Sequence, residues 1–439
     1  MSKKYIVNKV GGGIMVPALL PLFKKQLALQ IRRGYTPVVV VSAVKNVTDT
    51  LISYLEILKS KKSAHEIENF ITKLRVEHLK LFGKLPTKDL DETFELLSAD
   101  FTTYLNNPSV ELEAKIVSYG EKLSAVCSAE YFSDEKIKAV SVFAEKIPVL
   151  TDGVVKDANI LYRESEKKFA RYINDMKTIP VIAGFTGCTK DGTTTLLGRG
   201  GTDTTACFAG AALRAKKVIL WKDVGAVYSA DPRLVPQAHT IPFLSYDEIE
   251  EAGKIIQGKA VRYLRQNKIP AEIASLKNSK DKTVIIDGKK AKSGAKMVSF
   301  KKNLTLFSLH QGEARGYERL FEISNSCARH KINVVLIWND PAYLHIAVED
   351  TSGQLEELKG EIKNKFPEIE IIAVHMITIV GSFAWKDVNI FNKTLNILDK
   401  RAIMGAYTYQ KCRRMEGIVN AKNDLGNLLK SMHKTFIKK

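Results

Sequence analysis

A glycine-rich stretch at residues 184–206 contains the residues best suited to hold an anion. Its centre, residues 198–203, reads Gly-Arg-Gly-Gly-Thr-Asp. Glycine has no side chain, so backbone N–H groups there can approach a negative charge, and Thr202 and Asp203 are natural N-caps for the helical pattern that follows. A strand-like apolar run precedes the stretch. The pattern predicts an anion-binding loop with Arg199 held among the glycines.

Two further loops follow predicted strands and carry basic residues. Lys9 comes just before three glycines, residues 11–13, at the end of the first strand. Open α/β sheets place ligands at that position, and a lysine can act there as a point charge for a phosphate. The loop at residues 222–233 reads Lys-Asp-Val-Gly-Ala-Val-Tyr-Ser-Ala-Asp-Pro-Arg. Its aromatic and basic residues suit a nucleotide.

Several common kinds of site are excluded. The sequence has neither a GxxxxGK[ST] phosphate loop nor the HRD and DFG motifs of protein kinases. The five cysteines are widely spaced without a CxxC pair, so they indicate reduced thiols, not a disulfide framework or a zinc site. Histidines never recur at helical spacing. We therefore predict no protein-bound metal.

These loops need a parallel sheet to bring them together, and the pattern predicts one. Short β-branched runs alternate with longer helical periodicity, which is typical of a sheet covered by helices. Between about residues 48 and 129 almost everything is predicted to be helical. We expect an α/β domain over residues 1–276 with strands at Tyr5–Val10, Pro37–Ser42, Ile137–Val142, Ile179–Ala183, Val218–Trp221 and Pro270–Ala274.

The rest of the chain is predicted to repeat itself. Residues 277–302 are dense in lysine and small polar residues, which favours a linker, although the run Thr283–Asp287 is also compatible with a short strand. The run Leu304–Phe307 is echoed by Ile377–Val380 about 70 residues later, and similar helices and strands follow each run. We predict two βαββαβ modules, at residues 303–375 and 376–439.

Length and composition indicate a multi-domain globular protein. The chain has 439 residues, of which 45% are hydrophobic and 26% charged. No apolar run approaches the roughly 18 residues that span a bilayer, and the start of the chain lacks a signal-like segment. We expect a cytoplasmic protein with no membrane partner. The net charge of +19 comes mainly from scattered basic pairs. This favours a solvated surface over a nucleic-acid interface.

Together these motifs resemble aspartate kinase (aspartokinase), of the amino-acid kinase superfamily. Five ordered motifs carry the resemblance: Val41–Ala43 with Thr48–Asp49, Gly120–Ala125, Gly198–Asp203, Val227–Arg233 and Pro270–Ile273. It covers nearly the whole chain, because the family also carries two C-terminal ACT modules of βαββαβ type. The resemblance implies the amino-acid kinase fold, a mostly parallel sheet sandwiched by helices, followed by ACT-type modules.

The resemblance implies a reaction as well. ATP would phosphorylate the side-chain carboxylate of L-aspartate to give 4-phospho-L-aspartate, the first step toward lysine or diaminopimelate, threonine and methionine. Lys9 would contact the ATP phosphates and the transferring group, and Asp203 would orient the substrate amine or that lysine. The residues implied for the substrate are Thr48, Glu121, Phe185, Arg199 and Thr202. Those implied for the nucleotide are Lys9, Gly11, Gly12, Lys222, Asp223, Tyr228, Arg233 and Lys254. Mg²⁺ would arrive with ATP.

Two places depart from the family pattern. Gly13 and Ile14 stand where the first motif usually has two hydroxyl residues, and Gln257 and Gly258 replace a usual histidine and proline. The first change removes two hydroxyls near the phosphates, which predicts a lower turnover. In the regulatory half, ACT modules of the family pair across a dimer and bind a pathway amino acid. The resemblance therefore implies a homodimer. Val335 replaces an aspartate that lysine-sensitive members usually carry, so we predict weak or no inhibition by lysine.

Two alternatives remain open. The chain could be a catalytically impaired amino-acid sensor of the same fold, which the altered residues 13–14 and 257–258 support. It could also be a nucleic-acid-associated regulator on the strength of its charge alone. The effector, if one exists, cannot be named from the sequence, and neither can the downstream product.

Overall fold

The chain divides into two compact units. The computed structural model describes residues 3–60, 64–83, 88–252, 255–278, 280–288, 294–310, 316–382, 392–394, 396–397, 403–408 and 414–437. The first unit comprises Met1–Val227 and Thr240–Ala291, and the second comprises Tyr228–His239 and Lys292–Lys439. Each unit is described below by itself.

The first unit is built on a mostly parallel sheet with the strand order β3-β4-β2-β1-β7-β9-β10-β8. Its strands are β1 (Tyr5–Val10), β2 (Thr36–Val41), β3 (Ala139–Val142), β4 (Ile179–Ala183), β7 (Lys217–Trp221), β8 (Phe243–Ser245), β9 (Ala271–Ala274) and β10 (Lys282–Ile286). The four consecutive valines of β2 are all buried, as expected for a strand covered on both faces. Lys9 and Lys222 stand at the ends of the neighbouring parallel strands β1 and β7, so this edge of the sheet is strongly basic.

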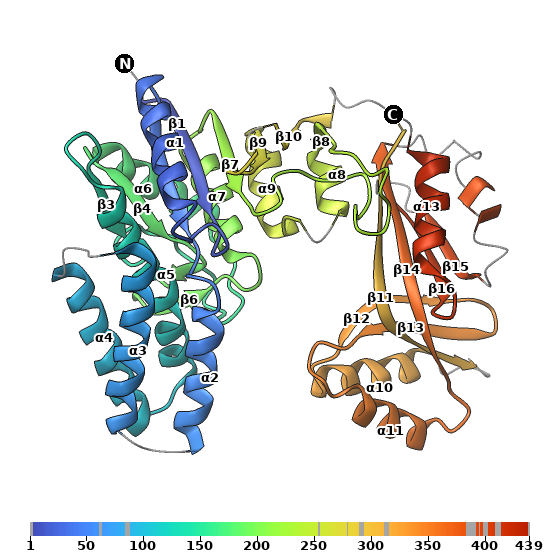
Figure 1. Cartoon of the computed structure of the whole chain (residues 1–439). Coiled ribbons are helices and arrows are strands. Elements are labelled where there is room, and N and C mark those ends of the chain that lie inside the picture. Colours follow the sequence, from blue (N-terminus) through green and yellow to red (C-terminus); the bar gives the residue numbers. More distant parts are fainter. Residues whose placement is uncertain are drawn as a thin grey trace. The chain divides into compact units, whose positions relative to one another are not determined.

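Helices cover this sheet and extend beyond one end of it (Figure 1). They are α1 (Leu20–Arg32), α2 (Val47–Ser60), α3 (Ala64–Phe82), α4 (Lys88–Asn106), α5 (Val110–Phe132), α6 (Tyr162–Asp175), α7 (Gly201–Ala212), α8 (Tyr246–Glu251) and α9 (Gly258–Asn267). Helix α5 begins at Ser109, whose side chain caps it by accepting a hydrogen bond from the Leu112 N–H. It packs on β3 and β4 and also contacts α2, α3 and α4. The helical elaboration is thereby fixed to the sheet.

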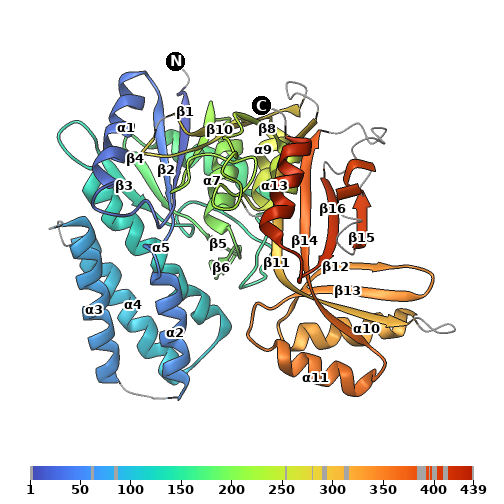
Figure 2. The same ribbon diagram turned by 45° about the vertical axis from the view of Figure 1, so that its right-hand side comes forward.

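The second unit contains an antiparallel sheet with the order β12-β13-β11-β14-β16-β15 (Figure 2). The strands are β11 (Gly294–His310), β12 (Asn333–Asn339), β13 (Tyr343–Glu349), β14 (Glu370–Ser382), β15 (Ile403–Thr408) and β16 (Arg414–Asn420). The long strands β11 and β14 pair along both halves, with a register shift between Lys301 and Leu304. Asn303, at this bulge, has φ of 59°. Each long strand therefore serves both modules.

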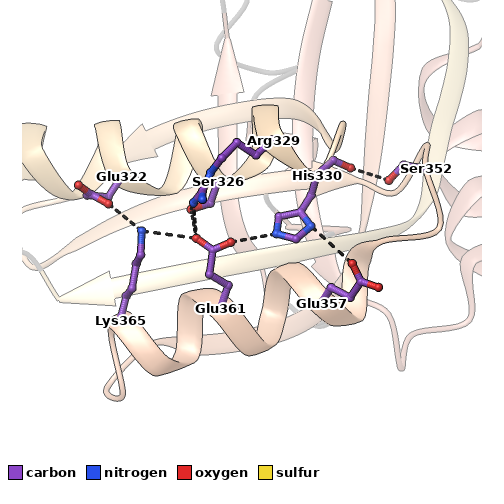
Figure 3. A network of polar contacts seen from close by, with 8 residues as sticks. All are labelled: Glu322, Ser326, Arg329, His330, Ser352, Glu357, Glu361 and Lys365. Atoms are coloured by element: carbon purple, nitrogen blue, oxygen red, sulfur yellow. Dashed lines mark hydrogen bonds and ion pairs between the residues drawn. The ribbon is translucent and has the colours of Figure 1, made fainter.

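Two helices of this unit, α10 (Gly316–Arg329) and α11 (Leu355–Lys365), are joined by a polar network (Figure 3). Glu361 accepts hydrogen bonds from Ser326 (2.7 Å) and from the ring of His330 (2.9 Å). These bonds, together with the charges of Arg329 and Lys365, hold the pKa of Glu361 at about 2. The carboxylate therefore stays ionised and keeps α10 beside α11. A further helix, α13 (Leu425–Phe436), begins at the N-cap Asp424.

A short segment, Tyr228–His239, interrupts the sequence of the first unit and belongs to the second unit. Ala230 and Val235 are buried in a core that includes Ile379 and residues of α13. The buried Ser229 hydroxyl lies 2.8 Å from Nε2 of His433. The chain thus leaves the first unit, contributes to the core of the second, and returns before it leaves for good.

The predicted fold class is confirmed: a mostly parallel α/β unit is followed by ACT-type βαββαβ structure. The predicted linker, residues 277–302, instead contains β10 and the first half of β11. Four of its lysines, Lys282, Lys296, Lys301 and Lys302, lie on these strands. Other residues of the same strands, such as Ile285 and Val298, are buried. Among the helices that the structure describes, none has both the length and the apolar character needed to span a membrane.

Candidate active site

The predicted substrate residues line one pocket of about 530 Å³ in the first unit. Its inner part is formed by the end of β1, the start of α2, the middle of α5 and the glycine-rich loop. Every substrate residue predicted from the sequence lies there, and so do both predicted catalytic residues. The lining residues include Lys9, Ser42, Thr48, Glu121, Phe185, Arg199, Thr202 and Asp203.

Asp203 holds two lysines at the edge of the sheet. Its carboxylate lies 3.0 Å from Nζ of Lys9 and 3.4 Å from Nζ of Lys222. Burial raises the pKa of Asp203, but the charges of Lys9 and Lys222 outweigh this effect and keep the pKa below its ordinary value. Lys222 also donates to the carbonyl of Ile255. The site therefore presents two ordered ammonium groups around one carboxylate.

The expectation that Thr202 or Asp203 caps α7 is corrected by the structure. The N-cap is Gly200, with φ of 74°, and both predicted caps lie in the first helical turn. Thr202 donates to the Ser42 hydroxyl (3.3 Å). Because glycine adopts positive φ at little cost, the chain can enter the helix from Gly200 and leave the Asp203 carboxylate free to bind lysines.

Glu121 carries a buried oxygen that awaits a partner. Its Oε1 accepts a hydrogen bond from the Ala43 N–H (3.0 Å), whereas Oε2 has no hydrogen-bond partner among the described residues. Burial raises the pKa of Glu121 to about 8, although the Ala43 N–H and the charge of Lys9 act in the opposite direction. Gly120 permits this packing, since a Cβ there would lie 3.0 Å from that of Ala43. A cationic ligand group would satisfy the free oxygen.

Arg199 is an exposed residue of the glycine-rich loop. Gly198 and Gly200 flank it with φ values of 71° and 74°. No carboxylate of the described part of the chain pairs with its guanidinium, so the charge is available to a ligand. Phe185, which has φ of 65°, packs against Gly201. A positive φ at a bulky residue is costly and is found mostly where function demands it.

The glycine loop after β1 explains one departure from the family pattern. A Cβ on Gly13 would lie 2.4 Å from a carboxylate oxygen of Asp223, and one on Gly12 would lie 2.7 Å from the Ala43 carbonyl. Any side chain at Gly13 must therefore displace Asp223. Ile14 is buried in the core of the first unit. The two residues that replace the family's hydroxyls thus have packing roles here.

The remaining nucleotide residues are not brought together by the described structure. Tyr228 and Arg233 belong to the second unit, where Arg233 pairs with Asp231 at 2.7 Å. Lys254 lies outside the described residues. Gln257 is the N-cap of α9, and its side chain packs against Gly200. The nucleotide roles of Tyr228, Arg233 and Lys254 therefore stay predictions.

The structure adds pocket residues that no motif indicated. Glu56, Glu113 and Lys156 line its outer part. They come from α2, from α5 and from the loop before α6. In the sequence they stand among ordinary helical and loop charges, without glycines or a spacing rule. The packing of α2 against α5 brings the two glutamates together, and an ion pair with Glu113 brings Lys156 to them.

Comparison with known proteins identifies the relatives of this chain. Residues 4–287, more than half of the chain, match the family model described as the Amino acid kinase family. Aspartokinase 1 of Bacillus subtilis is 32% identical over 184 residues, which cover 41% of this chain and 45% of that protein. The aspartokinase of Rickettsia felis is 36% identical over 176 residues, or 39% and 43% of the two chains. The match thus spans less than half the length of these relatives.

Solved structures extend the likeness to the whole chain. Escherichia coli aspartokinase III in complex with aspartate and ADP has a TM-score of 0.79, and the same protein with lysine and aspartate has 0.84. Both are 20% identical and cover 99% of this chain and 100% of theirs. At that identity the likeness shows the fold, including the C-terminal modules. The resemblance to aspartate kinases that the motifs predicted is confirmed, and the chain belongs to the amino acid kinase family.

Proposed function

We propose that the protein is an aspartate kinase, which transfers the γ-phosphoryl group of ATP to the side-chain carboxylate of L-aspartate. One observation carries the proposal: the buried Oε2 of Glu121 and the guanidinium of Arg199, both without a partner among the described residues, share a pocket with Lys9. An amino acid with a second carboxylate offers one partner to each of these charges. The similarity to aspartokinases supports the same substrate.

Recognition of aspartate follows from Arg199 and Glu121. Arg199 binds the α-carboxylate through its planar guanidinium, and Glu121 accepts from the ammonium group. Thr48, Phe185 and Thr202 line the space between them. The side-chain carboxylate is then directed toward Lys9.

Phosphoryl transfer in this site is a matter of charge. The substrate carboxylate, with an ordinary pKa of about 3.9, is ionised at neutral pH and needs no general base. Its approach to a phosphate oxygen costs about 4 kcal/mol per charge pair at 4 Å and an effective dielectric constant of 20. Lys9 and Lys222, ordered by Asp203, offset this repulsion. The carboxylate oxygen forms a bond to the γ-phosphorus as the bond to the β-phosphate oxygen breaks, and ADP leaves.

The loop after β1 supplies the nucleotide side of the proposal. The backbone at Gly11 and Gly12 faces the phosphates, with Lys222 and Asp223 beside it. Mg²⁺ bound to ATP would neutralise further phosphate charge. Among the described residues no group of three or more His, Cys, Asp or Glu side chains is arranged to hold a metal. The cytoplasmic location is part of this proposal.

The test is an acyl-phosphate trap. Purified protein with ATP, Mg²⁺, L-aspartate and hydroxylamine should form aspartyl hydroxamate, and omission of aspartate should abolish the product. D-aspartate serves as a matched control, because it cannot satisfy Arg199 and Glu121 together with Lys9. Binding of ATP and aspartate without hydroxamate would instead support the second candidate, an amino-acid sensor, which Gly13 and Ile14 favour.

Lysine should not inhibit this enzyme. Val335, on β12, packs against a core that includes Leu306 and Val374, and an apolar side chain cannot pair with a ligand ammonium group. We expect hydroxamate formation to change less than about twofold in 10 mM lysine. The reason is that the loss of one charged contact to a ligand strongly weakens its binding. Isothermal titration with lysine is the direct measurement, and micromolar binding would contradict the prediction. A homodimer through the second unit remains part of the proposal.

A further inference from the structure

A loop that no motif indicated lies directly against the glycine-rich loop. We call residues 152–160, between β3 and α6, the strap. Its backbone pairs with Leu196 on both sides, because the Leu196 N–H donates to the Val155 carbonyl (2.7 Å) and the Ala158 N–H donates to the Leu196 carbonyl (2.8 Å). Leu196 is only three residues before Arg199. The strap therefore borders the turn from which the substrate arginine projects.

Side-chain packing makes this contact closer. A Cβ on Gly198 would lie 2.1 Å from a carboxylate oxygen of Asp157. Gly198, which begins the Gly-Arg-Gly-Gly run, therefore leaves room for the strap. Asp152 closes the strap by accepting from Asn159 (2.9 Å). A shift of the strap must consequently move Gly198, and with it Arg199.

Ion pairs anchor the strap to two helices. Lys156 lies 2.7 Å from Glu113 of α5, and Asp157 lies 2.6 Å from Lys259 of α9. Glu113 also receives Lys59 (3.0 Å) and the hydroxyl of Tyr104 (2.7 Å). Burial raises the pKa of Glu113, but the hydrogen bonds from Lys156, Tyr104 and Lys59 prevail and hold it at about 2. The anchor on α5 is therefore a permanent anion.

Glu113 and Glu121 stand on one face of α5. They are eight residues apart, slightly more than two helical turns, and both line the pocket. Helix α5 thus carries the group that meets the substrate ammonium, and it also carries the anchor of the strap that borders Arg199. The Lys156 to Glu113 contact connects the two halves of the substrate site.

We infer that Lys156 and Glu113 form a positioning pair, which sets the separation of Arg199 and Glu121 and so tunes aspartate binding. The inference rests on the proposed function, because it concerns the recognition of that substrate. The pair acts through Arg199 and leaves the phosphoryl-transfer groups untouched. Its effect should therefore appear in KM for aspartate and not in kcat or in KM for ATP.

The test is a double-mutant cycle on the full chain. Lys156→Ala and Glu113→Gln should each raise KM for aspartate about fivefold, a modest effect because the Lys156 side chain is half exposed. The double variant should be no worse than either single one, since the partners act as a unit. Lys156→Arg should restore the wild-type KM. Lys190→Ala, which breaks an exposed pair with Glu164 in the same unit, should change nothing.

Three outcomes would overturn the inference. The first is an unchanged KM for aspartate in Lys156→Ala, and the second is a loss confined to kcat. The third is a double variant in which the two increases in KM add, which would mean that Lys156 contacts the substrate by itself. Absence of activity in the wild-type protein would instead defeat the proposed function. In that case hydrogen exchange still decides: Lys156→Ala should accelerate exchange of the Ala158 and Leu196 amides about fivefold. Unchanged exchange would refute the positioning role.

Discussion

Lys9→Met should lower kcat about 100- to 1,000-fold, the usual effect of removing one preorganised donor from a developing anionic centre. Its Nζ, near the end of β1, lies 3.0 Å from Asp203, within the pocket that we propose for the substrate. Methionine keeps the length of the apolar chain and removes only the charge. KM for aspartate should change little, because Arg199 and Glu121 remain. Hydroxamate formation at saturating ATP and aspartate is the measurement.

A second variant separates catalysis from folding. Lys9→Met leaves the buried Asp203 with Lys222 alone, which should lower the melting temperature. Lys9→Met/Asp203→Asn removes the buried anion as well, and should recover stability without recovering activity. A single variant that keeps more than a tenth of the wild-type kcat would remove Lys9 from the mechanism.

Glu121→Gln should make the protein more stable at alkaline pH. The folded-state pKa of Glu121 is about 8, against an ordinary value of 4.5. Between these values the folded protein keeps a proton that the unfolded chain has released, so stability falls as pH rises through this window. Glutamine avoids the penalty and can still accept from the Ala43 N–H. The variant should match the wild type near pH 5 and exceed it at pH 8.5 by a few kcal/mol, at about 1.4 kcal/mol per pKa unit.

Thermal unfolding across that pH range checks the prediction, and Glu113→Gln is its matched control. The pKa of Glu113 is depressed to about 2, so its ionised form stabilises the fold above its ordinary pKa. Its replacement should therefore lower the melting temperature at pH 8.5. If the stability of Glu121→Gln relative to the wild type did not increase between pH 5 and 8.5, burial would not disfavour ionisation of Glu121.

The same substitution should weaken aspartate binding. Loss of a charged hydrogen bond costs about 1.5–3 kcal/mol, or roughly 10- to 100-fold in KM. In the wild type, KM for aspartate should fall as pH rises from 6 to 8, because the ammonium group requires ionised Glu121. The variant should show no such slope, and KM for ATP should be unaffected in both. A flat wild-type profile would place the ammonium elsewhere.

Much of the first unit could be predicted because its strands carry strong local signals. Tyr5–Val10 and Ile179–Ala183 have the predicted bounds, and the run of valines in β2 differs by one residue at each end. The linker was misplaced for a physical reason. Gly294–His310 has three lysines among its buried residues, and it pairs with β14, whose paired residues lie from 62 (Ser308 with Glu370) to 88 (Gly294 with Ser382) positions further along the chain. Local composition cannot show such a partner.

The site divides in the same way. Arg199, Thr202 and Asp203 could be found because glycines with positive φ leave a visible pattern in the sequence. Glu113 and Lys156 could not, because their meaning comes from helix packing and not from neighbours in the chain. Nor could the sequence show that Gly13 touches Asp223, since the two are more than 200 residues apart.

The excursion at Tyr228–His239 has a consequence for how this architecture could arise and be dismantled. Because Ala230 and Val235 complete a core formed otherwise by the C-terminal half, no single cut in the polypeptide yields two intact pieces. A gene split after residue 291 would give one product that exposes the apolar residues Ala230 and Val235. The other product would lack these residues in its core. Recombination that replaces only one of the two units should therefore disrupt the core of the second unit.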